Sequence, residues 1–444
     1  MRSMVGRLGM LLAAVLCAVT LALPAKAQVI LRDAEMERAL RELARPIIAA
    51  AGLSPNRIRI VVLKESRLNA FVLDGRTIFI NSGLLLKMKR PAMLQAVLAH
   101  ELAHIANGHI TRRATNAKAA RNTALLGLLL SAAVASVDSQ AAGGLAVGST
   151  SAAQRAFLSH TRAEESSADQ SGLRYMADAN IDPEGMVEVM EIFTGQEVLS
   201  RSRQDPYART HPLSRDRLRR MRGLAAAYKE TEPPDPTSVY WFNRVKEKLS
   251  AYLSKPSYTL RRLKNDNSDA ARVARAWAYH KNSKTKRALA EIDALLAKRP
   301  KDPYAHELRG QILQESRNFG AAVASYKRAA ALAPREPLIL AGYGQALLAA
   351  GQAEAALKVL EQARARDPFN PRLMRDLGQG YAQTGRRGQA SLAVAERYAL
   401  QGKLSDAAIH AKRAVDLLPA GSTGSRRALD IIDAAKQQTT RRKR

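Results

Sequence analysis

The sequence of 444 residues predicts a mainly α-helical protein with two parts, an α+β domain in the first half and an α-solenoid in the second. Three observations lead to this fold class. An HExxH motif at residues 100–104 lies in an apolar run with helical spacing. Two strand-like runs joined by Asp74-Gly75 precede it. Prolines then recur every 34 residues from Pro300 onward, which is typical of stacked helical repeats.

The N-terminal residues 1–27 are predicted to be a signal peptide. Arginines precede an apolar run over 8–23, and Ala25-Lys26-Ala27 fits a small-x-small cleavage site. The apolar run is short for a bilayer span, so cleavage before Gln28 is expected rather than a transmembrane anchor. The single cysteine, Cys17, lies inside this segment, so a mature chain without thiols would suit an oxidising periplasm.

The runs 69–73 and 76–81 are rich in β-branched and aromatic residues. Asp-Gly between two such runs is a strong signal for a β-hairpin. An edge strand at this place could hold an extended substrate by β-augmentation, in which main-chain hydrogen bonds supply the affinity. The alternative is an ordinary sheet that only supports the following helix.

His100, Glu101 and His104 are the residues that point to chemistry. Residues four apart lie on one face of a helix, so both imidazoles can reach a single ion. Catalytic zinc sites take three protein ligands and keep a position for water, whose proton Glu101 could accept and pass to a leaving amine. Pro91 predicts the start of this helix and Asn107-Gly108 its end. The alternative is a core helix that carries two histidines without a metal.

A third ligand is expected on the next helix that carries carboxylates. Glu165 and Asp169 are one helical turn apart, so Glu165 could bind zinc while Asp169 accepts a hydrogen bond from a ligand histidine. Glu164 is the rival ligand, but it points roughly 100° away and has no Asp four residues later. His109 and His160 are interpreted as ordinary polar residues beside the motifs.

Segments 97–108 and 161–172 together resemble the M48 family of gluzincin metallopeptidases, whose second element reads SRxxExxADxxG. Thr161 in place of serine is a mild departure, and the resemblance covers residues 33–224. It implies a gluzincin-type fold with one zinc ion per chain. The implied metal ligands and catalytic residues are those proposed from the spacing, namely His100, His104 and Glu165 for the metal, and Glu101 and Asp169 for catalysis.

His211-Pro212 with Arg217 resembles a further family element, HPxxxxR. His211 could be a fourth metal ligand, a donor that stabilises an oxyanion, or a surface residue before a turn. If His211 occupied the position meant for water, the enzyme would be latent. Arg217 is a second candidate for the oxyanion donor.

Between the two metal-binding segments lies an apolar run over 124–137, followed by a Gly/Ala/Ser stretch that ends at 151. This run is shorter than the roughly 20 residues that span a bilayer. The segment 124–151 is therefore expected to be a lid or an interfacial hairpin rather than a core helix. In the resembled family this interval lies over the active site and can meet the membrane.

The second half of the chain carries the tetratricopeptide pattern. Pro300, Pro334 and Pro368 are 34 residues apart, and small residues recur in the same frame where two helices would touch. Stacked helix pairs form a groove that binds extended peptides or proteins, although an inert spacer is the alternative. The next equivalent proline is Pro419, 51 residues after Pro368, which predicts an extra helix.

These patterns divide the chain into five regions. The stretch 229–238 contains three prolines and is the predicted linker, followed by a helix over 239–250. The predicted regions are a signal peptide (1–27), a metallopeptidase domain (28–225), a linker with a connecting helix (226–268), a repeat domain (269–437) and a basic tail (438–444). The terminal Arg441-Arg442-Lys443-Arg444 is expected to be disordered.

The formal net charge of +30 favours anionic partners. Nucleic acid is not expected as a partner, because the chain is predicted to be exported, has few aromatic residues and carries no nucleic-acid motif. An anionic membrane surface or lipopolysaccharide suits the charge better. A generally solvated basic surface is the alternative.

The whole arrangement is similar to that of repeat-containing M48 proteases of the Gram-negative periplasm. That resemblance implies a quality-control enzyme that degrades unfolded or stalled outer-membrane proteins. The repeats would contact these substrates or the outer-membrane assembly machinery, with possible chaperone activity. The competing hypothesis is a non-proteolytic periplasmic chaperone or scaffold with a latent zinc site.

Overall fold

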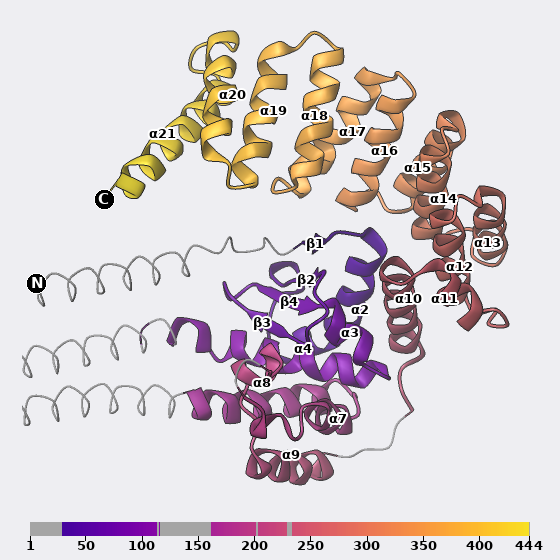
Figure 1. Cartoon of the computed structure of the whole chain (residues 1–444), viewed down its shortest axis with the longest axis vertical. Helices are drawn as coiled ribbons and strands as arrows, with labels where there is room; N and C mark the ends of the chain where they lie inside the picture. Colours follow the sequence, from indigo (N-terminus) through magenta and orange to yellow (C-terminus); the bar gives the residue numbers. More distant parts are fainter. Residues whose placement is uncertain (1–28, 113–114, 116–160, 201–202, 229–232, 444) are drawn as a thin grey trace, which may run out of the picture.

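The structure is a computed structural model that describes residues 29–112, 115, 161–200, 203–228 and 233–443 (Figure 1). The predicted signal peptide and the segment 124–151 lie outside these residues. Within them the chain is mainly helical, with one small sheet near its beginning and a long helical array after it, so the predicted fold class is confirmed. In this described part, no helix combines the length and the apolar character needed to span a membrane.

The sheet has four strands in the order β1-β2-β4-β3. They are β1 (Ile30–Leu31), β2 (Arg59–Leu63), β3 (Ala70–Val72) and β4 (Thr77–Asn81). β2 runs parallel to β4, and β3 pairs with β4 in the predicted antiparallel hairpin. Asp74 Oδ1 accepts hydrogen bonds from the amides of Arg76 and Thr77, and Gly75 takes a positive φ of 67°, which explains why this dipeptide reverses the chain. β3 is therefore an edge strand.

The sheet packs against the helices of the first domain. One of the longest is α4, which is buried over nearly its whole length and contacts α2, α7 and the sheet. It begins and ends where the sequence predicted, with Asn107 as its C-cap and the following Gly108 at a φ of 69°. The elements are α2 (Ala34–Ala50), η1 (Pro55–Arg57), α3 (Ser82–Lys87), α4 (Pro91–Ala106), an unlabelled helix over 161–178, α7 (Glu184–Ile192), η2 (Gln196–Val198), α8 (Pro206–Thr210) and α9 (Arg215–Ala227).

The connecting region is more helical than the sequence predicted. α10 (Pro236–Leu253) begins inside the predicted linker, because Asp235 caps it through the amides of Thr237 and Ser238 and Pro236 suits the first helical position. The linker therefore ends at Asp235 rather than at Ser238. Apolar residues of α10 belong to the core of the first domain, so α10 is part of that core rather than a free spacer. α11 (Pro256–Arg262) follows it.

The repeat array is built from helix pairs that stack side by side (Figure 1). Its helices are α12 (Asp269–Lys281), α13 (Thr285–Lys298), α14 (Pro303–Glu315), α15 (Phe319–Leu332), α16 (Pro337–Ala349), α17 (Ala353–Arg366), α18 (Pro371–Gln383), α19 (Arg387–Leu400), α20 (Leu404–Leu417) and α21 (Thr423–Lys443). A Cβ atom at Gly344 would lie 2.4 Å from the Leu360 side chain, so the small residue lets α16 and α17 approach. α20 is the extra helix expected before Pro419.

Residues 441–443, which were expected to be disordered, are helical in the structure. They continue α21, which ends at Lys443.

Arginines of the first domain contact three successive repeats. Each pairs with a carboxylate in the loop before or at the start of a repeat helix, at N–O distances of 2.7 to 2.9 Å. The pairs are Arg244 with Asp302, Arg41 with Glu336, and Arg32 with Asp367. These contacts fix the orientation of the array relative to the sheet and α2.

A cluster of buried charges lies where α2, α10 and α14 meet. Glu35 is fully buried, with its carboxylate bonded to Arg244 and 3.0 Å from Lys248 Nζ. Glu307 on α14 faces the same cluster. Burial and the negative charges of Asp33 and Glu35, partly offset by Lys248, raise the pKa of Glu307 from 4.5 to about 8. Glu307 therefore keeps its proton in the folded chain at neutral pH.

Replacement of Glu307 by glutamine is expected to stabilise the protein at alkaline pH. The unfolded chain releases the Glu307 proton near pH 4.5 and the folded chain only near pH 8. Between these values the folded state binds more protons, so the wild type loses stability as the pH rises, whereas the glutamine variant does not. Thermal unfolding at about pH 5 and about pH 9 measures the difference. Asp416→Asn on the exposed face of α20 is the control, and an equal shift at both pH values would contradict the assignment.

Candidate active site

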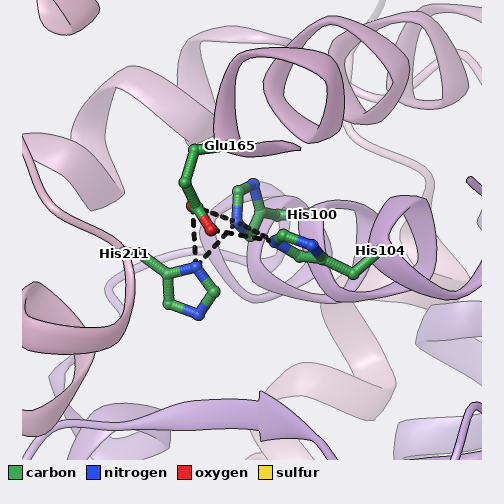
Figure 2. A group of neighbouring side chains, drawn as sticks. All are labelled: His100, His104, Glu165 and His211. Carbon is green, nitrogen blue, oxygen red and sulfur yellow. Dashed lines mark hydrogen bonds and ion pairs between the residues drawn. The ribbon is translucent and has the colours of Figure 1, made fainter. Parts of the chain in front are cut away.

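Four buried side chains from three elements converge on one point (Figure 2). His100 and His104 come from α4, Glu165 from the helix over 161–178, and His211 from the C-cap of α8. One nitrogen or oxygen atom of each lies within 4.8 Å of the others. The group consists of the three proposed ligands and the residue proposed as a fourth ligand or oxyanion donor.

The spacing of the donor atoms suits a tetrahedral ion. His100 Nε2 lies 3.1 Å from His104 Nε2 and 3.2 Å from His211 Nδ1. Glu165 Oε2 lies 2.8 Å from His211 Nδ1 and 3.3 Å from His100 Nε2, and Glu165 Oε1 is 3.4 Å from His104 Nε2. Zinc bonds of about 2.0–2.1 Å place tetrahedral ligand atoms roughly 3.3–3.4 Å apart. Five of the six separations between donor residues thus lie at 2.8–3.4 Å, so the residues present fit zinc, with His211 as a fourth donor.

Two contacts hold the helix of Glu165 close to α4. Gly172 lies against the backbone of Ala99 and His100, where a Cβ atom would be 3.4 Å from both, an ordinary contact distance, and 2.9 Å from Cε of Met186. Asn107, the C-cap of α4, donates hydrogen bonds of 3.1 Å to the hydroxyls of Ser167 and Ser171. These contacts position Glu165 over the two histidines.

Asp169 lies behind His100, on the side away from the cluster. Its Oδ1 is 3.1 Å from His100 Nδ1, which leaves His100 Nε2 directed at the other donors. Arg217 Nε and Nη2 donate to the two oxygens of Asp169 at 2.6 and 2.8 Å, and Nη2 is also 3.2 Å from Glu165 Oε2. Arg217 therefore positions these two carboxylates, which differs from the oxyanion role suggested by the sequence.

The electrostatics of the cluster favour a bound cation. Burial opposes a charged imidazole, but hydrogen bonds and charges from Asp169 and Glu165 outweigh it and raise the pKa of His100 to about 9. Burial also opposes ionisation of Glu165, yet His211 and His100 hold the pKa of Glu165 well below its ordinary value. Arg217 overcomes the effect of burial on Asp169 and lowers its pKa as well. Arg217 offsets the charge of one of these two carboxylates, and the negative charge that remains in a site shielded from water suits a bound cation.

Glu101 is fully buried beside the donor cluster without belonging to it. Its Oε1 lies 3.4 Å from His211 Nε2, the ring nitrogen opposite to the one in the cluster. Tyr207 packs against the His211 ring with a centroid distance of 4.6 Å. Tyr207 was not singled out from the sequence, and its amide also donates to the carbonyl of Leu68 ahead of β3, which fixes α8 near the sheet.

His109 was interpreted as an ordinary polar residue, and this interpretation is wrong. Its side chain is only 1% exposed, and His109 Nδ1 lies 2.9 Å from His104 Nδ1. With His104 Nε2 in the cluster, an N–H on His104 Nδ1 can donate to His109, which fixes the tautomer and orientation of the ligand. The turn at Gly108 brings His109 back over α4. The sequence feature that could have indicated this role is a histidine directly after the glycine that ends the HExxH helix.

Replacement of His109 by alanine is expected to weaken zinc binding by about 10- to 100-fold, because His104 loses the partner that orients its ring. Competition with a chromophoric zinc chelator measures the affinity. His410→Ala in the repeat array is the control and should bind zinc like the wild type. Equal affinities for both variants would show that His109 has no such role.

Three further features predicted from the sequence are Glu164, His160 and the segment 124–151. Glu164, the rival ligand, is buried but is not a member of the donor group. His160 and the segment 124–151 lie outside the described residues.

Residues 31–225 match the family described as peptidase family M48, and residues 273–337 and 313–377 match tetratricopeptide repeat families. The beta-barrel assembly-enhancing protease of Escherichia coli is 24% identical over 196 residues, which cover 44% of this chain and 40% of that protein. The protein of the same name from Yersinia pestis is 25% identical over 206 residues, covering 46% of this chain and 41% of that protein.

A third relative is the mitochondrial metalloendopeptidase OMA1 of Schizosaccharomyces pombe, which is 32% identical over 181 residues, or 39% of this chain and 49% of that protein. The chain thus spans between two fifths and one half of the length of these curated relatives. The match to the peptidase family, over residues 31–225, falls on the domain that holds the donor cluster. This chain therefore combines a metallopeptidase domain of family M48 with tetratricopeptide repeats.

Proposed function

We propose that the chain is a periplasmic zinc-dependent endopeptidase for protein quality control that degrades misassembled outer-membrane proteins. The tetrahedral spacing of the donors from His100, His104 and Glu165, with Glu101 buried beside them, is the observation that carries this proposal. The names of the bacterial relatives support the class of client. The predicted signal peptide supports export to the periplasm.

Each site residue has a separate role in this proposal. His100, His104 and Glu165 hold one zinc ion per chain. When bound, zinc supplies Lewis acidity, which polarises a scissile carbonyl and acidifies water. Glu101 accepts the proton of the attacking water and delivers it to the leaving amine. Asp169, whose Oδ1 lies 3.1 Å from His100 Nδ1, orients the ring so that Nε2 faces the ion.

The edge strand β3 is the proposed place for an extended substrate. It pairs with β4 on one side, and it contacts α4, which carries the HExxH motif. Main-chain hydrogen bonds to an edge strand bind a peptide with little regard to its side chains, which suits an enzyme with many unfolded clients. We propose that the repeats add contacts to the same clients or to the assembly machinery.

Replacement of His211 by alanine is expected to raise the basal rate of casein cleavage several-fold. His211 Nδ1 occupies the fourth corner of the donor set, so in this arrangement it competes with water for the ion. Initial cleavage rates, together with zinc content, measure the effect. His306→Ala, outside the first domain, should cleave like the wild type. A loss of activity in His211→Ala would instead assign His211 to stabilisation of the oxyanion.

The second candidate function is a chaperone or scaffold whose zinc site stays latent. The position of His211 in the donor set favours it, because a closed site would give little cleavage. Client binding that persists without any cleavage, in His211→Ala as well as in the wild type, would support this function over the peptidase.

Zinc removal is the experiment that tests the proposed function. The mature chain is expected to carry one zinc ion per molecule, to lose casein cleavage when a strong chelator removes the ion, and to recover cleavage when zinc is added back. Elemental analysis and initial rates provide the two measurements. A purified chain that takes up no stoichiometric divalent metal would rule out the peptidase proposal.

A further inference from the structure

A cavity of about 1510 Å³ lies between the first domain and the repeat array. Its walls come from α2, η1, the β3–β4 turn and α10 on one side, and from the loops that follow α13, α15 and α17 on the other. None of the four donor residues of the metal cluster lines it. The cavity is therefore a second candidate site, which we call the interdomain pocket.

The lining of the interdomain pocket is strongly basic. Eleven arginine and lysine residues line it, against five carboxylates. All five carboxylates are already engaged within the protein. Glu37 and Asp367 pair with Arg32, Glu336 pairs with Arg41, Asp302 pairs with Arg244, and Asp74 accepts hydrogen bonds from its own turn. The pocket thus keeps a net positive charge that the protein itself does not neutralise.

Five basic residues of the pocket are exposed and unpaired. Within the described residues, none of them makes an ion pair or a hydrogen bond through its side chain. They are Arg57, Arg76, Lys298, Lys301 and Arg335. Like charges held around one cavity repel each other, and a bound anionic ligand would relieve this repulsion. Arg57 and Arg76 come from the first domain and Arg335 from the repeats, so a ligand in the pocket would contact both parts of the chain.

Apolar groups lie among these charges. Trp241 and the prolines of the repeat loops line the pocket, and Phe369 at its rim has 68% of its surface exposed. A ligand that fits the pocket therefore combines negative charges with apolar groups. Because the basic residues line a hollow between two domains, a flat bilayer surface would not reach them, whereas an extended chain would.

We propose that the interdomain pocket binds an acidic, extended polypeptide segment of another protein. The β3–β4 turn, with Asp74 and Arg76, forms part of the pocket wall, so a segment anchored there lies at one end of the edge strand β3. This binding goes beyond the proposed peptidase activity and does not depend on the metal ion. It would give the repeats a means to select acidic chains and to present them to the first domain.

The test is a binding assay with the full mature chain carrying Glu101→Gln, so that the probe is not cut. The probe is a fluorescein-labelled peptide of about ten residues that alternates Glu and Phe, roughly 35 Å long when extended. A matched peptide with Lys in place of Glu is the charge control. Fluorescence anisotropy measures the Kd, which should rise with added salt for the acidic peptide.

Two triple variants with the same change in charge locate the binding site. Arg57→Glu, Arg76→Glu and Arg335→Glu together alter the pocket, while Lys327→Glu, Arg328→Glu and Lys358→Glu alter exposed positions on α15 and α17 outside it. The pocket variant is expected to raise the Kd at least about tenfold, and the control variant less than about twofold. Thermal unfolding verifies that both variants fold.

Three results would overturn the proposal. Equal weakening by both triple variants would mean that the overall positive charge attracts the peptide without a defined site. Absence of binding of the acidic peptide by the unaltered pocket would exclude the ligand class. Binding of phosphatidylglycerol vesicles that only the pocket variant loses, without binding of the peptide, would assign the pocket to an anionic lipid. Zinc content is measured separately on each variant, so a failure of the metal centre and a failure of the pocket are distinguished.

Discussion

Replacement of Glu101 by glutamine is expected to lower the rate of casein cleavage by about 10²- to 10⁴-fold, the usual contribution of general acid–base catalysis. Glutamine has nearly the same shape but cannot accept the proton of the attacking water. Glu101 is fully buried and lies next to His211 Nε2 rather than in the donor set. The variant should therefore keep one zinc ion per chain while losing nearly all of its activity.

Initial rates of casein cleavage and elemental analysis of the same sample check this expectation. Glu164→Gln is the control, because it makes the same chemical change at a buried carboxylate outside the donor group. It should keep both zinc and activity, whereas Glu165→Gln should lose zinc. Cleavage by Glu101→Gln at the wild-type rate would show that Glu101 has no part in the mechanism. Loss of zinc from Glu164→Gln, but not from Glu165→Gln, would make Glu164 the metal ligand in place of Glu165.

Replacement of Arg244 by methionine is expected to lower the free energy of unfolding by about 3–5 kcal/mol, which is the usual cost of removing one partner of a buried ion pair. The side chain of Arg244 has no exposed surface. It pairs with the equally buried Glu35 and lies 2.9 Å from Asp302, the N-cap of α14 in the repeat array. Methionine fills much of the same volume, so the loss reflects the uncompensated carboxylates rather than a cavity.

Urea denaturation of the full chain measures the change in unfolding free energy. The double variant Arg244→Met with Glu35→Gln should regain part of the loss, because it no longer leaves the Glu35 charge without its arginine. Arg222→Met is the control, since Arg222 forms an exposed pair with Glu191 at 2.8 Å and such pairs contribute about 0–1 kcal/mol. Equal losses in the two single arginine variants would show that burial of the Arg244 pair has no special importance.

The features that the sequence predicted well are those encoded by short-range spacing. Pro91 and Asn107 delimit the HExxH helix because proline suits the first turn and the following Gly108 takes a positive φ. Asp74-Gly75 forms the hairpin turn through hydrogen bonds to neighbouring amides. The 34-residue period predicted the stacked helices in the same way, because its small residues let the two helices of one repeat approach, as Gly310 does beside Tyr326 and Gly344 beside Leu360.

The sequence was less informative where a residue's partner lies far along the chain. The predicted linker extended too far, to Ser238, because α10 begins at Pro236 and packs against α2 and α12. The role of Arg217 changed for a related reason. As a residue in an HPxxxxR element it resembled an oxyanion donor, but its bonds reach Asp169, which lies 48 positions earlier.

By itself, the sequence determined the helix that carries His100 and His104, the hairpin before it and the repeat array, since each depends on residues within one or two turns or one repeat. Only the tertiary structure decided that His109 supports His104, that His211 completes the donor set, and that a basic pocket lies between the domains. Contacts such as that of Arg32 with Asp367 join residues 335 positions apart, and packing of the whole chain, rather than any local pattern, brings them together.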